Sequence, residues 1–370
     1  MSLDPSLSVA VVLIAAGVLA LEFRISGAVT EIFAGMLLGF FVQGLIAVEW
    51  FNFLAHFGIL ALMFMAGFEV DVNRIRATWK ASVGIGMASL LVPVAGLFAV
   101  CHYLLSLPPK VSLLMGVGLS TTSLALTYQS LKDRNLLGQQ SGATLMGAAS
   151  VVDVLSMVLL AATLGNVGWG TAVFLAFVIP TLIGLPRLSR WVLRRYRGNA
   201  VEFEMRFLLM VLLGLGFLSG HAGIHPAIVA FTVGLVLGEL AVDHEELEVK
   251  LRGIVFSLLA PIFFLHAGAQ MNLRVIDLKV AGVAALLFAV VYGLKYLAAR
   301  VATRLLTSLN GHFAGVLLNY QLTFGIIAAS VGLQEGFLDQ KLYSVILMGV
   351  VASIVLSMYL LQEVQAEVDR

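Results

Sequence analysis

The sequence predicts an all-α, polytopic membrane protein of about thirteen transmembrane helices, and three observations lead to this fold class. The 370 residues are 60% hydrophobic and only 12% charged, with a mean hydropathy of +1.02, whereas globular proteins are about one quarter charged. Nearly the whole chain divides into apolar segments of about 20 residues, the length that spans a bilayer. Finally, the positive charges gather on one of the two sides that these segments define. Residues 1–370 are therefore predicted to form a single transmembrane unit.

Thirteen apolar segments follow one another along the chain, with short polar connections between them. They cover residues 6–23, 27–47, 51–69, 80–106, 110–131, 140–164, 168–186, 203–220, 224–241, 252–271, 277–299, 311–332 and 341–362. The first segment is preceded by Asp4 and by no basic residue. A signal peptide would begin with a positively charged region, so we interpret this segment as the first spanning helix.

The Lys and Arg residues predict the orientation of these segments. On the side that holds the N-terminus, the connections carry four of them: Lys110, Arg274, Lys279 and Lys341. The other side carries seventeen: Arg24, Arg74, Arg76, Lys80, Lys132, Arg134, Arg187, Arg190, Arg194, Arg195, Arg197, Arg206, Lys250, Arg252, Arg300, Arg304 and Arg370. Because cytoplasmic connections are enriched in Lys and Arg, this bias predicts an outside N-terminus and a cytoplasmic C-terminus. We expect the plasma (inner) membrane of a prokaryote.

Composition and motifs exclude several other classes of protein. A net charge of +1 argues against a nucleic-acid partner, which would need a clustered basic surface. The single cysteine, Cys101, allows no internal disulfide and no thiolate metal cluster, and His221, His225 and His266 lack metal-ligand spacing. The chain contains no Walker loop, G-x-S-x-G elbow, H-E-x-x-H motif or dinucleotide fingerprint after a strand. We therefore expect no enzymatic activity and no cofactor.

Two segments carry small and polar residues at mid-depth, which predicts that their helices are broken. The fifth contains Ser120, Thr121, Thr122 and Ser123, and the twelfth contains Asn319, Tyr320 and Gln321, followed by Thr323 and Gly325. They lie in the two halves that the basic run 187–198 separates, which is typical of inverted repeats with broken crossing helices. Unwound backbone would present carbonyl groups and helix ends to a cation. The alternative is that these side chains bond to their own helix or link neighbouring helices.

Asp153 lies in the middle of the sixth segment. A carboxylate at membrane mid-depth costs roughly 2.5–3.5 kcal/mol on insertion scales, so one that persists usually faces a cavity or a partner. A carboxylate removed from water can hold a proton near neutral pH and exchange it for a metal ion. We expect Asp153 to bind a monovalent cation and a proton in turn, with Thr121, Thr122 and Ser150 as oxygen ligands or neighbours. The alternative is a protonated Asp153 that only links helices.

Lys295 is the second ionisable residue well inside a predicted span. Its ammonium group is expected to seek a carboxylate or the carbonyl groups of a broken helix. In a functional role it would balance the charge of Asp153 when no cation is bound, and in a structural role it would be a donor between helices. Glu69, at the end of the third segment, is expected to form a salt bridge at the level of the lipid headgroups.

With these residues in view, the chain resembles the monovalent cation:proton antiporter superfamily, and it is most similar to the membrane domain of Kef-type and NapA-type sodium or potassium:proton exchangers. GAVTEIFAGMLLG (27–39) is similar to the family's G-E-I-L-A-G-hydrophobic-L-G-P stretch, with Phe40 in place of proline. GILALMFMAGFEVDVNRIR (58–76) resembles G-hydrophobic-L-F-x-A-G-L-E-x-D. LSTTSLAL (119–126) resembles the family's broken helix, and PIFFLHAGAQMNL (261–273) resembles P-x-F-F-x-x-x-G-x-x-x-x-L. Together, in this order, the four motifs identify the family.

This resemblance implies several further properties. Asp153 matches the ion-binding member of the family's pair of polar residues, while Val152 stands where relatives carry Asp, Asn or Gln. Lys295 matches the family's lysine opposite that pair. The resemblance also implies a homodimer with dimerisation-type helices (1–78 and 203–275), a mobile core (79–166 and 276–364) and a linker helix with a basic connector (167–202).

We therefore expect an antiporter that exchanges Na⁺ or K⁺ for H⁺ by alternating access. If Asp153 alone changes protonation, exchange is electroneutral, which we favour; if Lys295 also releases a proton, it is electrogenic. Cation selectivity, pH set point and direction of flux stay open. The alternatives are a solute:cation symporter of similar architecture, a channel, and a non-transporting membrane sensor or assembly subunit.

Overall fold

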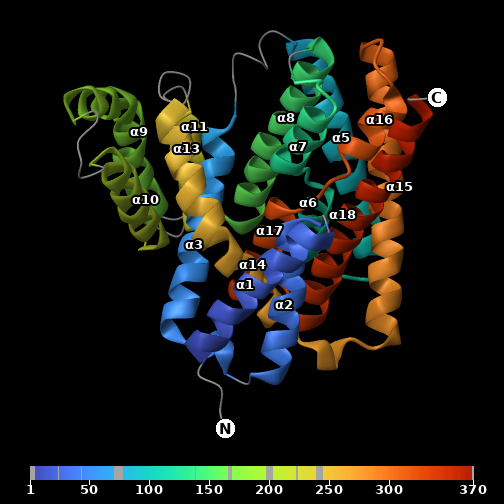
Figure 1. The fold of residues 1–370 in the computed structure, drawn as a ribbon, viewed down its shortest axis with the longest axis horizontal. Helices are drawn as coiled ribbons and strands as arrows, with labels where there is room; N and C mark the ends of the chain where they lie inside the picture. Colours follow the sequence, from blue (N-terminus) through green and yellow to red (C-terminus); the bar gives the residue numbers. More distant parts are fainter. Residues whose placement is uncertain are drawn as a thin grey trace. The chain divides into compact units, whose positions relative to one another are not determined.

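The fold is built entirely from helices in the part of the chain that can be described (Figure 1). The computed structural model describes residues 5–23, 25–42, 44–70, 78–137, 139–165, 169–196, 203–221, 224–238 and 245–368. Each of the thirteen apolar segments contains at least one helix, so the predicted all-α fold class is confirmed. Five of the positive charges that contribute to the predicted orientation lie outside the described residues: Arg24, Arg74, Arg76, Arg197 and Arg370.

Length and apolar composition mark most of these helices as membrane spans. Nine helical stretches within the described ranges are suitable: Pro5–Phe23, Glu49–Phe68, Trp79–Leu104, Pro109–Asp133, Gln140–Leu164, Phe203–Gly220, Glu246–Gln270, Leu278–Leu306 and Gln340–Gln362. Three shorter apolar helices are Gly27–Phe41, Pro226–Leu237 and Thr323–Gln334. The predicted number of thirteen is thus approximate, but the protein is a multi-pass membrane protein.

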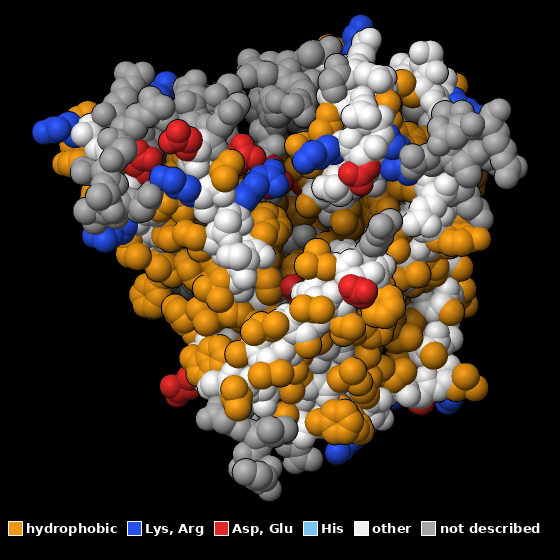
Figure 2. All heavy atoms as spheres, in the orientation of Figure 1, with side chains coloured by type: hydrophobic (Ala, Val, Ile, Leu, Met, Phe, Trp, Pro, Cys, Tyr) orange, Lys and Arg blue, Asp and Glu red, His pale blue; other side chains and the backbone are white. Residues whose placement is uncertain are grey.

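Large apolar side chains cover the outer surfaces of these helices (Figure 2). Leu7, Val11, Ile14 and Leu21, all on the first helix, are between 56% and 82% exposed. Such a helix surface is unfavourable in water, whereas in a bilayer it contacts lipid tails.

The chain divides into two compact units, each formed by two separate stretches. The first unit is Met1–Val70 with Leu164–Leu273. Its helices are α1 (Pro5–Phe23), α2 (Gly27–Phe41), α3 (Glu49–Phe68), α9 (Trp169–Tyr196), α10 (Phe203–His221), α11 (Pro226–Leu237), α13 (Glu245–Ile254) and α14 (Ala260–Gln270). A short 3₁₀ helix, η1 (Leu45–Ala47), precedes α3, and a π-helical turn, η3 (Val255–Leu259), joins α13 to α14.

In the first unit, α14 packs against α2 and α3, and α3 packs against α11. The α2–α14 contact depends on glycine: a Cβ atom on Gly35 would lie 2.0 Å from the carbonyl oxygen of Leu265, and one on Gly268 would lie 2.0 Å from that of Ile32. Small residues at such crossings let two backbones approach closely within a membrane. Next to this contact, Leu38, Phe51 and Leu265 belong to one buried apolar cluster.

Gly35→Ala is therefore expected to destabilise the protein by about 1–3 kcal/mol, because the backbone of α14 must move to admit the methyl group. Thermal unfolding of the purified protein in detergent measures the effect. Gly17→Ala is the matched control, since a Cβ atom on Gly17 has no neighbour within 4 Å, and it should be neutral or slightly stabilising. Equal melting temperatures for the two variants would contradict the packing.

The second unit is Asp71–Thr163 with Arg274–Arg370. Its helices are α5 (Trp79–Ala99), α6 (Pro109–Ser120), α7 (Leu124–Asp133), α8 (Gln140–Leu164), α15 (Leu278–Leu306), α16 (Gly311–Leu317), α17 (Thr323–Gln334) and α18 (Gln340–Val368). A π-helical turn, η2 (Val100–Leu104), extends α5. The long helix α15 packs against α5, α16 and α18, while α6 packs against α5 and α17.

Local sequence accounts for where several of these helices begin. Pro109 opens α6, where its missing N–H is not needed and its fixed φ suits a first turn. Asp277 precedes α15 and accepts a hydrogen bond of 2.8 Å from the backbone N–H of Val280. Asn310 precedes α16 and accepts hydrogen bonds from two backbone N–H groups of its first turn. The starts of α15 and α16 thus satisfy N–H groups that would otherwise lack partners within the helix.

Candidate ion-binding site

The first broken helix consists of α6 and α7. Ser120 is the last residue of α6, residues 121–123 are not helical, and α7 starts at Leu124. The hydroxyl of Ser123 accepts a hydrogen bond of 3.4 Å from the backbone N–H of Leu126 and so caps α7. Ser and Thr favour such caps over helix interiors because their side chains compete for backbone groups. All four of these polar residues, 120–123, are buried.

The second broken helix consists of α16 and α17. It is interrupted over residues 318–322, which include Gln321. Thr323 and Gly325, which we expected in the break, lie in the first turn of α17, so the break is shorter than the sequence suggested. Asn319 donates a hydrogen bond of 2.8 Å to the carbonyl of Gly315, which ties the break to the end of α16.

The two breaks contact each other directly. The backbone N–H of Ser123 donates to the carbonyl of Tyr320 at 2.6 Å, and the hydroxyl of Thr122 donates to the carbonyl of Leu318 at 2.8 Å. Just beside them, a Cβ atom on Gly325 would lie 2.7 Å from the carbonyl oxygen of Gly118. Backbone groups that the helices leave without partners are therefore partly satisfied by the other break. We refer to residues 120–123 and 318–322 together as the crossing.

Lys295 reaches the crossing from α15. Its side chain is fully buried, and its ammonium group donates hydrogen bonds to the carbonyl oxygens of Ser120 and, at 2.6 Å, of Thr121. The C-terminal end of a helix carries a partial negative charge from its unpaired carbonyl groups, so a cation is favourable there. The sequence allowed two kinds of partner for Lys295, and its ammonium group donates hydrogen bonds to one of them, the broken-helix carbonyls.

Asp153 lies in α8, is 2% exposed, and is close enough to Lys295 for their charges to interact. Ser150, one turn earlier, is also buried, and its hydroxyl donates to the carbonyl of Met146 at 3.1 Å. Ser156, three residues after Asp153, is fully buried as well. We had not predicted Ser156, although its spacing from Asp153 places it on the same side of the helix.

Val152 stands beside Asp153, at the position where the sequence resemblance implied a second polar residue. It is fully buried in an apolar cluster with Leu90 and Val94 of α5 and Val117 of α6. A polar side chain at this position would lie among apolar neighbours, at a cost in desolvation. Asp153 is thus the one acidic residue of the pair in this chain.

The predicted site residues therefore all fall in the second unit, and most of them surround the crossing. Hydrogen bonds bring Ser120, Thr121, Thr122, Ser123 and Lys295 to the crossing. The structure adds Asn319, whose amide also donates to the carbonyl of Tyr292 at 3.5 Å. Asn319 was visible in the sequence as part of the polar triplet, but the sequence did not indicate its side-chain partners. Together these groups present oxygen atoms and one buried carboxylate, the ligands that hard cations prefer.

The other ionisable candidates have structural partners or lack metal-binding geometry. Glu69 forms a salt bridge of 3.0 Å with Arg252, which also pairs with Glu248. His266 is buried in α14 against Phe51. Within the described ranges, no group of three or more His, Cys, Asp or Glu residues could hold a metal ion.

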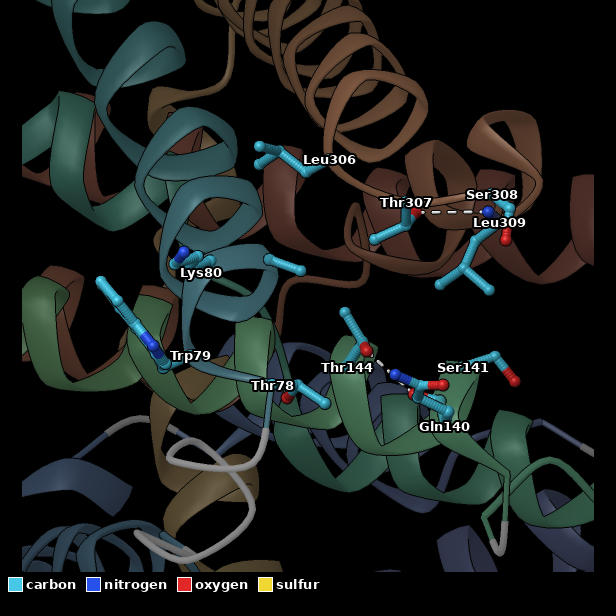
Figure 3. Close-up of a pocket in the computed structure, with 11 residues that line it drawn as sticks. Thr78, Trp79, Lys80, Gln140, Ser141, Thr144, Leu306, Thr307, Ser308 and Leu309 are labelled. Carbon is cyan, nitrogen blue, oxygen red and sulfur yellow. Dashed lines mark hydrogen bonds between the residues drawn. The ribbon is translucent and has the colours of Figure 1, made fainter.

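A polar pocket of about 410 Å³ opens in the second unit away from these contacts (Figure 3). Its wall includes Thr78 and Lys80 at the start of α5, Gln140 and Thr144 at the start of α8, and Thr307 after α15. Beyond it, α5 and α8 touch: the hydroxyl of Ser82 donates to the carbonyl of Thr144 at 3.1 Å, and a Cβ atom on Gly147 would lie 2.5 Å from that hydroxyl. On α8, the pocket residue Thr144 lies nine positions before Asp153.

Comparison with known proteins identifies the family of this chain. The chain matches the family described as "Sodium/hydrogen exchanger, transmembrane" over residues 8–362. It is 27% identical over 336 residues to "Probable Na(+)/H(+) antiporter 3" of Methanocaldococcus jannaschii, which covers 87% of this chain and 86% of that protein. It is 25% identical over 338 residues to "Na(+)/H(+)-K(+) antiporter GerN" of Bacillus cereus, with 87% and 85% covered.

A solved structure shares the fold. The sodium proton antiporter MjNhaP1 from Methanocaldococcus jannaschii, determined at pH 8, superposes with a TM-score of 0.67 at 16% identity over 94% of both chains. The family match, which covers nearly the whole chain, confirms the resemblance that the four motifs indicated. The protein therefore belongs to the sodium/hydrogen exchanger family within the monovalent cation:proton antiporter superfamily, and it is a secondary transporter and not an enzyme.

Proposed function

We propose that this antiporter exchanges one monovalent cation, Na⁺ or K⁺, for one H⁺ by alternating access, with Asp153 as the shared binding group. The observation that carries this proposal is a buried carboxylate beside a crossing of two broken helices whose carbonyl groups and hydroxyls are themselves buried. A proton and a cation both neutralise the carboxylate, and each makes binding of the other less favourable. This competition couples the two flows.

The oxygen atoms around Asp153 determine how a cation can be held. Thr121, Thr122 and Ser150 remain the proposed ligands or neighbours. The hydroxyls of Thr122 and Ser150 already donate their hydrogens to backbone carbonyls, so their lone pairs are available to a cation. The backbone carbonyl of Thr121 is bound to Lys295, so its side-chain hydroxyl is the better candidate.

Lys295 acts as the charge partner in this proposal. Its ammonium group is bound to two helix-end carbonyls, and a positive charge is favourable at that end of a helix. If Lys295 keeps its proton, only Asp153 changes protonation and exchange is electroneutral. The apolar packing of Val152 supports this stoichiometry, because it leaves one acid at the polar-pair position.

The two units support a division of labour. We assign 79–166 and 276–364 to a mobile core, 1–78 and 203–275 to dimerisation-type helices, and 167–202 to a linker helix with its basic connector. The limits of the two compact units lie close to these boundaries, and all the proposed binding residues belong to one unit. We further propose a homodimer in a prokaryotic plasma membrane, with the N-terminus outside and the C-terminus in the cytoplasm.

Proton flux in proteoliposomes tests the proposal. We expect Na⁺ or K⁺ gradients to drive proton movement, while choline does not. The names of the two relatives suggest that both Na⁺ and K⁺ should be tried. Clamping the membrane voltage with valinomycin and K⁺, in Na⁺-driven assays, should leave an electroneutral rate unchanged. Proton flux that requires an organic solute would instead indicate the symporter, and no flux with any cation would indicate a sensor or assembly subunit.

A further inference from the structure

Gln321 is the most isolated polar side chain of the crossing. It lies in the second break and is fully buried. Neither its Oε1 nor its Nε2 atom has a hydrogen-bond partner among the described residues. A buried carboxamide that makes no hydrogen bond loses its interactions with water without compensation, so such groups are rare in native proteins. This side chain is therefore suited to a polar group that the chain itself does not supply.

The crossing contains other buried polar atoms that, like those of Gln321, lack a hydrogen-bond partner among the described residues. On the same break, the Oδ1 atom of Asn319 lacks a hydrogen-bond partner in the described part of the chain, and so do the hydroxyl oxygens of Ser120 and Thr121 on the first break. All three side chains are at most 1% exposed. The hydrogen bond from Ser123 N–H to the carbonyl of Tyr320 joins the two segments. Neutral oxygen atoms with unused lone pairs are thus concentrated at one place in the fold.

The character of these atoms indicates the class of ligand. Three neutral oxygens and the Gln321 Oε1 atom favour a cation over an anion, and the acidic residue of the proposed site is Asp153. Lys295, the charged donor that reaches the crossing, is already bound to the carbonyls of Ser120 and Thr121. A cation that leaves water needs such oxygens to replace its hydration shell.

We propose that the Gln321 carboxamide is a binding group for the transported monovalent cation and helps to set the Na⁺ to K⁺ preference. This inference rests on the proposed function and adds to it a side-chain ligand from the second broken helix. The Oε1 atom replaces one water of the hydration shell. Because a neutral oxygen attracts a small cation less strongly than a carboxylate does, the number of neutral ligands beside Asp153 influences which ion binds better.

Gln321→Leu tests this role by removing both polar atoms at similar side-chain volume. We expect the KM for the cation to rise roughly tenfold or more, because a hydrogen-bonding ligand is lost, and the Na⁺ to K⁺ ratio of KM values to change. Gln321→Glu adds a carboxylate and is expected to shift the preference towards Na⁺ over K⁺. The matched control is Gln334→Leu, at the exposed end of α17, which should leave KM and the ratio unchanged. All rates are measured as proton flux in proteoliposomes.

Binding without transport gives a second readout. If Na⁺ or K⁺ raises the melting temperature of the purified wild-type protein, Gln321→Leu should require a higher cation concentration for the same shift, whereas Gln334→Leu should not. A variant that unfolds more easily but keeps the wild-type KM, ion ratio and cation-dependent shift would show a merely structural Gln321 and overturn the inference. Should Gln321→Leu fail to fold, Gln321→Glu decides alone, and an unchanged ratio would overturn it.

The proposed function can fail separately. Absence of cation-driven proton flux in the wild-type protein would refute antiport of these ions whatever the Gln321 variants do. Normal exchange in the wild type, lost in Asp153→Asn but insensitive to Gln321, would refute only the inference.

Discussion

Asp153→Asn is expected to abolish cation-driven proton flux in proteoliposomes. The amide has nearly the shape of the carboxylate, so α8 and its packing are retained. It carries no charge at any working pH and binds no exchangeable proton, so it can neither attract the cation nor carry the proton. Because both halves of the exchange cycle are removed, we expect the transport rate to fall at least a hundredfold. This corresponds to an increase of about 2.7 kcal/mol in the activation free energy of transport.

The matched control is Asp339→Asn. Asp339 is exposed and accepts a hydrogen bond of 2.8 Å from the backbone N–H of Leu342 at the start of α18. Asparagine caps helices about as well as aspartate does, so this variant should transport normally. Melting temperatures of both variants in detergent verify that they are folded. Wild-type exchange in a folded Asp153→Asn protein would rule out Asp153 as the shared site.

Lys295→Met is expected to reduce transport strongly and also to destabilise the protein. The ammonium group satisfies two buried carbonyl oxygens at the end of α6, and methionine leaves both without that donor. Hydrogen bonds to a charged group contribute about 1.5–3 kcal/mol each, although removal of a buried charge offsets part of the loss. We therefore expect a decrease of about 3 kcal/mol in the free energy of unfolding.

Thermal unfolding in detergent measures this effect, and Lys279→Met is its matched control. Lys279 lies in the first turn of the same helix and is exposed, so its replacement should change stability by less than about 0.5 kcal/mol. The double variant Asp153→Asn with Lys295→Met tests whether the two charges are coupled. If Lys295 balances Asp153, the stability losses of the single variants will not add. Additive losses would limit Lys295 to anchoring α6.

The sequence predicted the two broken helices and the two buried charges for a physical reason. In a bilayer, each spanning segment must satisfy its own backbone hydrogen bonds, so departures from an apolar helix are costly and easily recognised. Ser120 to Ser123 and Asn319 to Gln321 were such departures, and so were Asp153 and Lys295. The end of the second break was predicted less accurately. Thr323 and Gly325 lie in the first turn of α17, where Gly325 packs close to the carbonyl of Gly118, a contact with another helix that the sequence pattern does not contain.

What the sequence determined by itself was therefore local: the helices, the places where they are interrupted, and the family to which their motifs belong. The partner of Lys295, 175 positions away at Ser120, was decided only by the tertiary structure, and so were the contact of the two breaks and the partnership of Glu69 with Arg252. Such contacts depend on which helices pack together and at which height. A sequence pattern describes one helix at a time, whereas a binding site at a crossing belongs to several.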